Sequence, residues 1–143
     1  MRLLLVIACS FALGAAIDHS GVADLIAGYL SGWAASDPLW TLVLVYVVAV
    51  VFTELLTNNA AAVLMFPIGL SAAEHLGVNP MPFVMAIMMG ASAGFMTPIG
   101  YQTNLMIYGP GGYRFVDYLR VGGPLSLVVG FAVLWAIPVF WPF

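Results

Sequence analysis

Two short clusters of uncharged polar residues interrupt long apolar runs, and they are the residues of this sequence best suited to chemistry. The first, the tip cluster, is Thr57-Asn58-Asn59, and the second, the loop cluster, is Gln102-Thr103-Asn104. A buried amide without a hydrogen bond costs on the order of a few kcal/mol in hydrocarbon, so each cluster needs partners. Their oxygens are hard neutral ligands suited to Na⁺, and their amide and hydroxyl hydrogens suit an oxyanion.

A purely structural role, as polar contacts between membrane helices, is the alternative for both clusters. Pro98 and Gly100 precede the loop cluster inside an otherwise apolar run. Proline removes a backbone donor and glycine weakens a helix, so we expect the helix to break in this region. A broken helix at membrane depth exposes carbonyls and amides that form ion sites. The predicted break therefore favours binding over a structural role.

The composition indicates a polytopic, all-α membrane protein. The chain has 143 residues, of which 64% are hydrophobic and 6% charged, whereas soluble domains carry about 25% charged residues. A net charge of −3 without a basic cluster excludes nucleic-acid binding. A single Cys excludes a disulfide framework, and Ser92 has no His or Lys base nearby. We therefore expect that the protein is not an enzyme and that it carries no cofactor.

The first two predicted elements lie before position 37. An apolar stretch over 3–17 is typical of the end of a membrane span, with a signal peptide as the alternative. In 20–36 the apolar residues recur on one helical face, which predicts a helix lying in the membrane interface. A short membrane helix is the alternative for this second element.

The remaining elements surround the two polar clusters. The run 39–73 is shorter than the roughly 40 residues plus a turn that two complete crossings require. We therefore expect a re-entrant hairpin with the tip cluster buried at its tip, and two full crossings remain the alternative. A broken span is predicted over 81–108 and a last span over 124–141.

The charged residues orient these elements. With Arg2 in the cytoplasm, this arrangement of elements places Arg114 and Arg120 in the cytoplasm as well. Four acidic residues lie outside: Asp18, Asp24, Asp37 and Glu74. This distribution agrees with the positive-inside rule. It does not distinguish a hairpin from two crossings, because both return the chain to the same side.

Two segments carry a resemblance to a known family: TELLTNNAAAVLMFPI and GASAGFMTPIGYQTNLMIYGPGGYRFVDYLRVGGPL. They resemble the C-terminal part of the divalent anion:sodium symporter family of the ion transporter superfamily, a citrate-transporter-like membrane domain. The resemblance implies one half of an inverted-repeat transporter over 1–143, with a horizontal arm helix, a re-entrant hairpin and a broken helix. It also implies a missing N-terminal repeat, a homodimer of the full-length protein, and a location in the inner (plasma) membrane.

The implied activity is sodium-coupled transport of a small anion such as a dicarboxylate or sulfate, with Na⁺ as coupling ion. The family's tip sequence Ser-Asn-Thr and loop sequence Thr-Pro-Pro-Asn are both altered here, which leaves the anion open. By resemblance, the substrate-binding residues are Thr57, Asn58, Asn59, Thr103 and Asn104, and the Na⁺-binding residues are Thr53, Asn58, Gly100 and Gln102.

Other functions remain open at this stage. Within the superfamily, the alternatives are a proton-coupled antiporter and an arsenite-type permease. Outside it, the chain could be a non-transporting membrane subunit whose polar clusters serve assembly. Glu54 is either a proton site or a carboxylate hydrogen-bonded within the hairpin. Because one repeat is absent, residues 1–143 alone are not expected to transport.

Overall fold

The computed structural model describes residues 8–9, 12, 15–17, 19–34 and 37–143. All the regular secondary structure in this part of the chain is α-helical, which confirms the predicted all-α class. Much of the predicted span 3–17 lies outside the described residues, as does Arg2. The side of the membrane on which the first span starts therefore stays a prediction.

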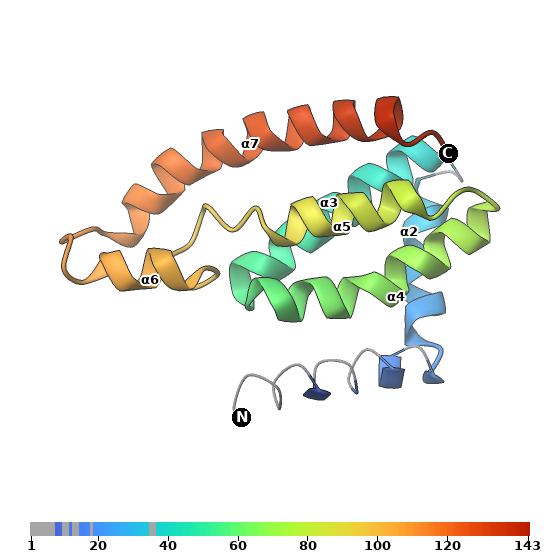
Figure 1. The fold of residues 1–143 in the computed structure, drawn as a ribbon, viewed down its shortest axis with the longest axis horizontal. Helices are drawn as coiled ribbons and strands as arrows, with labels where there is room; N and C mark the ends of the chain where they lie inside the picture. Colours follow the sequence, from blue (N-terminus) through green and yellow to red (C-terminus); the bar gives the residue numbers. More distant parts are fainter. Residues whose placement is uncertain (1–7, 10–11, 13–14, 18, 35–36) are drawn as a thin grey trace.

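Helices α3 and α4 run antiparallel and are joined at Leu56 and Thr57 (Figure 1). Helix α3 (Pro38–Leu55) begins where the Asp37 carboxylate accepts the Leu39 amide hydrogen at 2.8 Å, with Pro38 in the first turn. Helix α4 (Asn58–Leu76) ends at Gly77, whose φ of +65° is the left-handed conformation that stops a helix. The tip cluster therefore lies where α4 begins.

A non-helical segment, 92–101, separates α5 (Met81–Ala91) from α6 (Gln102–Tyr108). Below, this segment is called the break loop. Helix α5 ends well before Pro98, where we expected the break to begin. The small residues that follow it, Ser-Ala-Gly, pack few side chains, and the residue before a proline disfavours the helical conformation. Both effects favour early unwinding.

Helix α7 (Phe115–Phe140) begins earlier than position 124, where the last span was expected to start. The Asp117 carboxylate accepts the Arg114 backbone amide at 2.7 Å, which caps the first turn. Pro124 then lies inside the helix, as membrane helices tolerate. Helices α7 and α3 are both long and apolar enough to cross a membrane.

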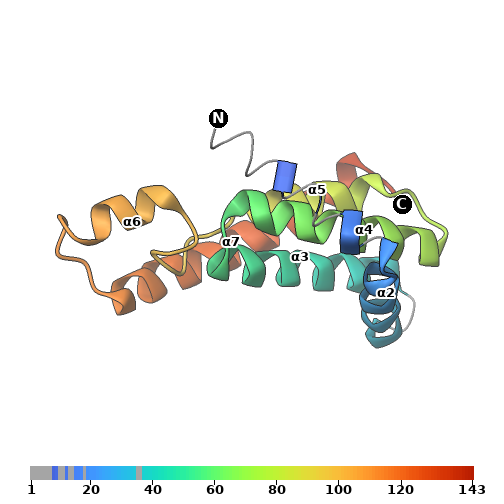
Figure 2. The same ribbon diagram turned by 90° about the horizontal axis from the view of Figure 1, so that it is seen from below.

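Helix α2 (Val22–Trp33) lies across one end of the other helices, at a steep angle to them (Figures 1 and 2). It packs on α4 through the buried Ala23 and Ala27. The Ser71 hydroxyl of α4 donates to the Asp24 carboxylate at 2.5 Å. Ile26 also packs against the core, whereas four other large apolar side chains of α2 are exposed: Val22, Leu25, Tyr29 and Trp33. This arrangement is compatible with the predicted helix in the membrane interface.

The core lies between α3, α4 and α5, where Leu42, Met65 and Phe83 are almost completely buried. Small residues allow these helices to approach closely. A Cβ added at Gly90 would lie 3.0 Å from the Ala49 Cβ and 3.1 Å from the Tyr46 carbonyl oxygen. This bundle places the hairpin tip beside the break loop.

Candidate ion and anion site

Three neutral oxygens meet where α3 and α5 end. The fully buried Thr53 hydroxyl lies 2.5 Å from the Ala91 carbonyl oxygen and 2.9 Å from the Asn58 Oδ1. One hydroxyl hydrogen can serve only one of these two acceptors. Three oxygens thus share a single hydrogen, an arrangement poor in donors and suited to a cation.

The Asn104 side chain ties α6 to the break loop. Its Nδ2 donates to the Gly94 carbonyl at 3.2 Å and to the Thr97 carbonyl at 3.3 Å. Both carbonyls belong to unwound backbone and lack a helical amide partner. One side chain from the loop cluster therefore satisfies two oxygens that the break had exposed.

Two glycines allow the break loop to lie against the hairpin. A Cβ added at Gly94 would lie 3.7 Å from Thr53 Oγ1 and 3.8 Å from Asn58 Oδ1. A Cβ added at Gly100 would lie 2.4 Å from the Thr53 carbonyl oxygen, which is a backbone clash. The loop backbone therefore borders the oxygen cluster, and only glycine fits at position 100 without a shift.

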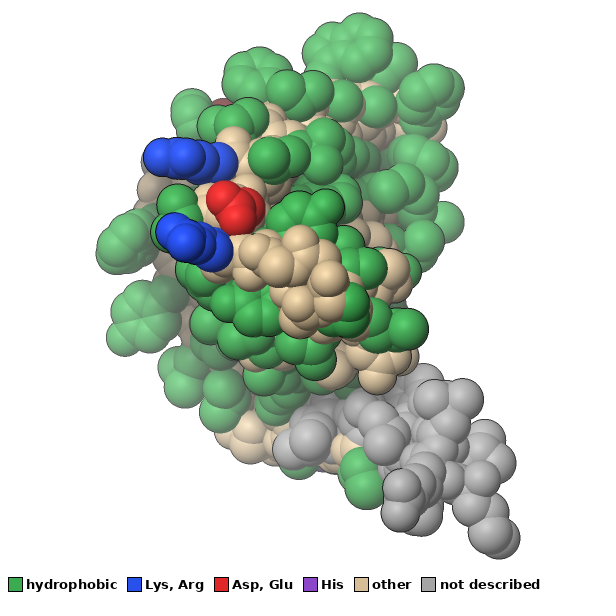
Figure 3. All heavy atoms as spheres, turned by 90° about the vertical axis from the view of Figure 1, so that its left-hand side faces the viewer, with side chains coloured by type: hydrophobic (Ala, Val, Ile, Leu, Met, Phe, Trp, Pro, Cys, Tyr) green, Lys and Arg blue, Asp and Glu red, His purple; other side chains and the backbone are tan. Residues whose placement is uncertain are grey.

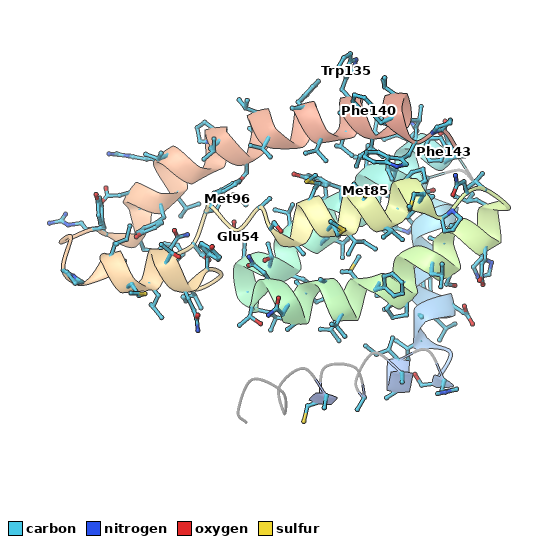
Figure 4. All side chains as sticks on the ribbon, in the orientation of Figure 1. Glu54, Met85, Met96, Trp135, Phe140 and Phe143 are labelled. Atoms are coloured by element: carbon cyan, nitrogen blue, oxygen red, sulfur yellow. The ribbon has the colours of Figure 1, made fainter. Side chains whose placement is uncertain are left out.

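Glu54 joins the hairpin to the break loop by two hydrogen bonds. Its Oε1 accepts the Met96 amide hydrogen at 2.8 Å, and its backbone carbonyl accepts the Thr97 hydroxyl at 2.8 Å. Figure 4 shows Glu54 directly beside Met96. Its Oε2 is buried without a hydrogen-bond partner. The carboxylate thus bonds to the break loop rather than within the hairpin, which corrects the structural alternative considered from sequence.

The predicted site residues divide into two groups. Thr53, Asn58, Gly100 and Asn104 lie around the junction of the hairpin tip and the break loop. Four others are exposed in this chain rather than buried: Thr57, Asn59, Gln102 and Thr103. The Thr57 hydroxyl accepts the Ala60 amide at 3.4 Å, which caps α4. The expected burial of the tip cluster is therefore wrong for this chain, because no described element covers the outer side of the tip. The binding roles of all these residues stay predictions.

Sequence reasoning missed several contacts at the junction. The Ala91 carbonyl, the Met96 amide and the Thr97 hydroxyl act through backbone or a small side chain, and only the observed position of the break reveals them. The run Gly-Ala-Ser-Ala-Gly over 90–94 is the one signal that could have indicated an earlier break. Tyr118 of α7, whose hydroxyl donates to the Asn104 carbonyl at 3.0 Å, gave no signal.

Among the residues that the structure describes, no cationic side chain contacts this junction. The sequence contains no Lys or Arg between Arg2 and Arg114. Arg114 and Arg120 flank Asp117 near the start of α7, and Figure 3 shows two basic side chains on either side of an acidic one on this face. Asp37 and Glu74 lie at the opposite ends of α3 and α4 from the tip.

Comparison with known proteins gives a consistent result. The profile of the citrate transporter family matches residues 1–142. An uncharacterised transporter of Synechocystis sp. is 45% identical over 127 residues, which cover 84% of this chain and 20% of that protein. Sodium/sulfate cotransporter 1 of Chlamydomonas reinhardtii is 39% identical over 137 residues, 92% of this chain and 16% of that protein. Sodium-dependent high-affinity dicarboxylate transporter 3 of Caenorhabditis elegans is 31% identical over 125 residues, 87% of this chain and 22% of that protein.

The chain thus spans between 16% and 22% of the length of these relatives. The matched family and relatives are transporters rather than enzymes, which confirms the family resemblance and the non-enzymatic prediction. Together with the two helices long enough to span a bilayer, they identify a membrane protein. The chain belongs to the citrate transporter family.

Proposed function

We propose that this chain forms one half of the binding site of a secondary transporter that couples Na⁺ to the movement of a small divalent anion. One observation carries the proposal: three neutral oxygens, from Thr53, Asn58 and the Ala91 carbonyl, converge where two helices end. Unwound carbonyls and helix C-termini are the groups that bind Na⁺ in transporters built on broken helices.

The helix termini support a cation and an anion side by side. Helices α3 and α5 end at the oxygen cluster, and a helix C-terminus carries a partial negative charge. Helix α4 begins at Asn58, and its first amides carry the complementary positive charge. Na⁺ binds among the oxygens of Thr53, Asn58 and Gly100. The anion binds beside the α4 N-terminus, against the tip and loop clusters.

The absence of Lys and Arg between Arg2 and Arg114 gives a physical reason for coupling. A dianion that leaves water for this neutral junction loses hydration that amides and hydroxyls replace only in part. A bound Na⁺ supplies the missing positive charge at short range, so each ion raises the affinity for the other. By linkage, that effect is reciprocal.

The position of the hairpin tip, rather than the length of its helices, supports a re-entrant path. Helix α3 has 18 residues and α7 has 26, which correspond to about 27 Å and 39 Å. The tip ends beside the break loop rather than at the far end of α7 (Figure 1). We propose that an inverted companion repeat supplies the other half of the site, and that the complete transporter is a homodimer in the plasma membrane.

Sulfate and dicarboxylates are the candidate substrates. The relative named for sodium/sulfate cotransport is more similar to this chain than the one named for dicarboxylate transport, at 39% against 31% identity. Sulfate is therefore the first anion to test and succinate the second.

Uptake of labelled sulfate and succinate by the complete transporter in proteoliposomes tests the proposal. Uptake should require an inward Na⁺ gradient and should fall strongly in Asn58→Ala and Asn104→Ala. Asn79→Ala removes an amide far from the junction, near the chain terminus, and is the matched control. Undiminished uptake in the first two variants would show that the site assignment is wrong.

The alternatives give different outcomes in the same assay. Uptake or efflux driven by a pH gradient without Na⁺ would identify a proton-coupled antiporter, and arsenite efflux would identify a metalloid permease. A non-transporting membrane subunit would give no gradient-driven flux of any of these solutes.

A further inference from the structure

One face of helix α7 contacts both the break loop and helix α6. A Cβ added at Gly122 would lie 2.0 Å from the Phe95 carbonyl oxygen and 2.9 Å from the Met96 amide nitrogen, so the helix backbone rests directly on the break loop. One turn earlier, the Tyr118 hydroxyl donates to the Asn104 carbonyl of α6 at 3.0 Å. Residues four apart lie on the same side of a helix. This face of α7 therefore holds the loop and α6 together.

Helix α6 has few other attachments within the described part of the chain. None of its seven residues is buried, and it takes part in none of the principal helix-to-helix contacts among the described helices. The Tyr118 ring packs against Tyr108 at 6.1 Å and Tyr113 at 6.0 Å between ring centroids. Tyr118 is thus the main residue that joins α6 to α7.

The hydrogen bonds continue from Tyr118 to the ion-binding junction. Tyr118 bonds the backbone of Asn104, and the Asn104 side chain bonds the Gly94 and Thr97 carbonyls. Gly94 in turn borders Thr53 and Asn58. A shift of Asn104 away from Tyr118 would therefore change its distance from Asn58, the central residue of the tip cluster.

A cavity beside Tyr118 makes its hydroxyl bond important. The cavity has a volume of about 390 Å³ and is lined mainly by apolar side chains of the break loop, α6 and α7, with Asn104, Tyr118 and Gly122 among the lining residues. On the side of this cavity the Tyr118 ring has open space rather than packed side chains. The hydrogen bond to Asn104 and the ring contact with Tyr108 are then the contacts of Tyr118 that hold α6 beside α7.

We propose that Tyr118 is a positioning residue for anion binding: it holds Asn104 at the distance from the hairpin tip that the bound anion requires. This role rests on the proposed function, since Asn104 is the anion ligand through which Tyr118 acts. Tyr118 itself does not touch the anion. Gly122 provides the second contact, which keeps the break loop in place while Tyr118 sets α6.

The test compares Tyr118→Phe with Tyr113→Phe in the complete transporter. The first variant removes the hydroxyl bonded to Asn104 and keeps the ring. The second removes a hydroxyl from the same ring cluster that has no hydrogen bond among the described residues, and whose side chain is exposed. Tyr118→Phe should raise the half-saturating anion concentration by about three- to tenfold, with a maximal rate within about twofold of the parent. Tyr113→Phe should change neither quantity.

The proposal would be overturned if Tyr118→Phe and the parent reached half-maximal uptake at the same anion concentration. A lower maximal rate at an unchanged half-saturating anion concentration would overturn it too. Hydrogen exchange of this chain in lipid nanodiscs gives a readout that does not depend on transport. Tyr118→Phe should speed amide exchange across 102–108, while Tyr113→Phe should not. Faster exchange in a protein that shows no Na⁺-driven uptake would refute the proposed function but keep the link between Tyr118 and α6. Unchanged exchange would refute that link whatever the transport result.

Discussion

The α3–α4–α5 bundle and the α6–α7 pair are built from similarly apolar helices, yet they are held together in different ways. In the bundle, large side chains such as Leu42, Met65 and Phe83 are buried almost completely. In the pair, α6 buries none of its residues, and the buried residues of α7 are Gly122, Gly130 and Ile137. The bundle is held by packing, and the second half of α7 packs on it through Val133, Leu134 and Ile137. By contrast, α6 and the first half of α7 are held by a few hydrogen bonds and backbone contacts.

The outer face of α7 is apolar. Trp135 and Phe140 point outward from α7 (Figure 4), and Trp135 is 72% exposed. Apolar side chains carry no penalty against lipid, so this face is compatible with a helix that crosses the bilayer. The junction of the hairpin tip and the break loop lies between the packed bundle and the α6–α7 pair.

Among the variants that test this comparison, Thr53→Val in the bundle is expected to have the largest effect on transport. The change keeps the side-chain shape but leaves the Ala91 carbonyl and Asn58 Oδ1 without their shared donor. An unpaired buried group costs about 1–3 kcal/mol, and the proposed Na⁺ ligand is also lost. The Na⁺ concentration that gives half-maximal uptake should rise by at least about tenfold. Thr53→Ser keeps the hydroxyl and should retain most of the affinity. Equal Na⁺ affinity in the Val variant and the parent would remove Thr53 from the site.

The next largest effect is expected from Gly122→Ala in the pair. The added methyl would overlap the Phe95 carbonyl, so α7 must move away from the break loop. Overpacking of this kind costs about 1–3 kcal/mol. Thermal unfolding of the chain in detergent should begin at a lower temperature, and anion uptake should fall. Gly123→Ala, with no atom within 4 Å of its added Cβ, is the matched control and should be tolerated. Similar melting of both variants would contradict the predicted contact.

A moderate effect is expected from Glu54→Gln, which tests the connection between bundle and loop. The amide oxygen of Gln can still accept the Met96 hydrogen, so the loop should stay in place. Glu54→Ala removes this acceptor and should cost about 1 kcal/mol. In uptake kinetics, Glu54→Gln should have a Na⁺ affinity close to that of the parent, and Glu54→Ala should bind Na⁺ more weakly. A Gln variant as impaired as Ala would indicate that the charge itself is needed.

The smallest effect on stability is expected from Gln102→Ala. Its side chain is exposed and makes no hydrogen bond among the described residues. Unfolding of the chain should therefore be unchanged within about 0.5 kcal/mol. The Na⁺ concentration that gives half-maximal uptake in the complete transporter should nevertheless rise if Gln102 is the Na⁺ ligand that the family resemblance implies. Unchanged transport would show that Gln102 is not a Na⁺ ligand.

Part of the site could be predicted from residue types alone. Asn58 and Asn104 stand out because amides are unusual within apolar runs, and Gly100 stands out as part of the expected helix break. The family resemblance, rather than residue type, implied roles for Thr53 and for the Gly100 carbonyl. The structure brings these four residues to one junction. The position of the break could not be predicted as well. Pro98 is a strong local signal, but the helix ends at Ala91 because small residues and contacts with the hairpin compete there. Such contacts between distant segments leave no local pattern.

The sequence by itself determined that this is an all-helical membrane protein with two polar interruptions, because composition and periodicity are properties of single segments. Only the tertiary structure decided which oxygens meet. The Ala91 carbonyl, the Met96 amide bonded to Glu54, and the Tyr118 hydroxyl on Asn104 are contacts between segments far apart in the chain or between backbone groups that every residue carries. Backbone groups have no sequence signature, so their role appears only once the helices are packed.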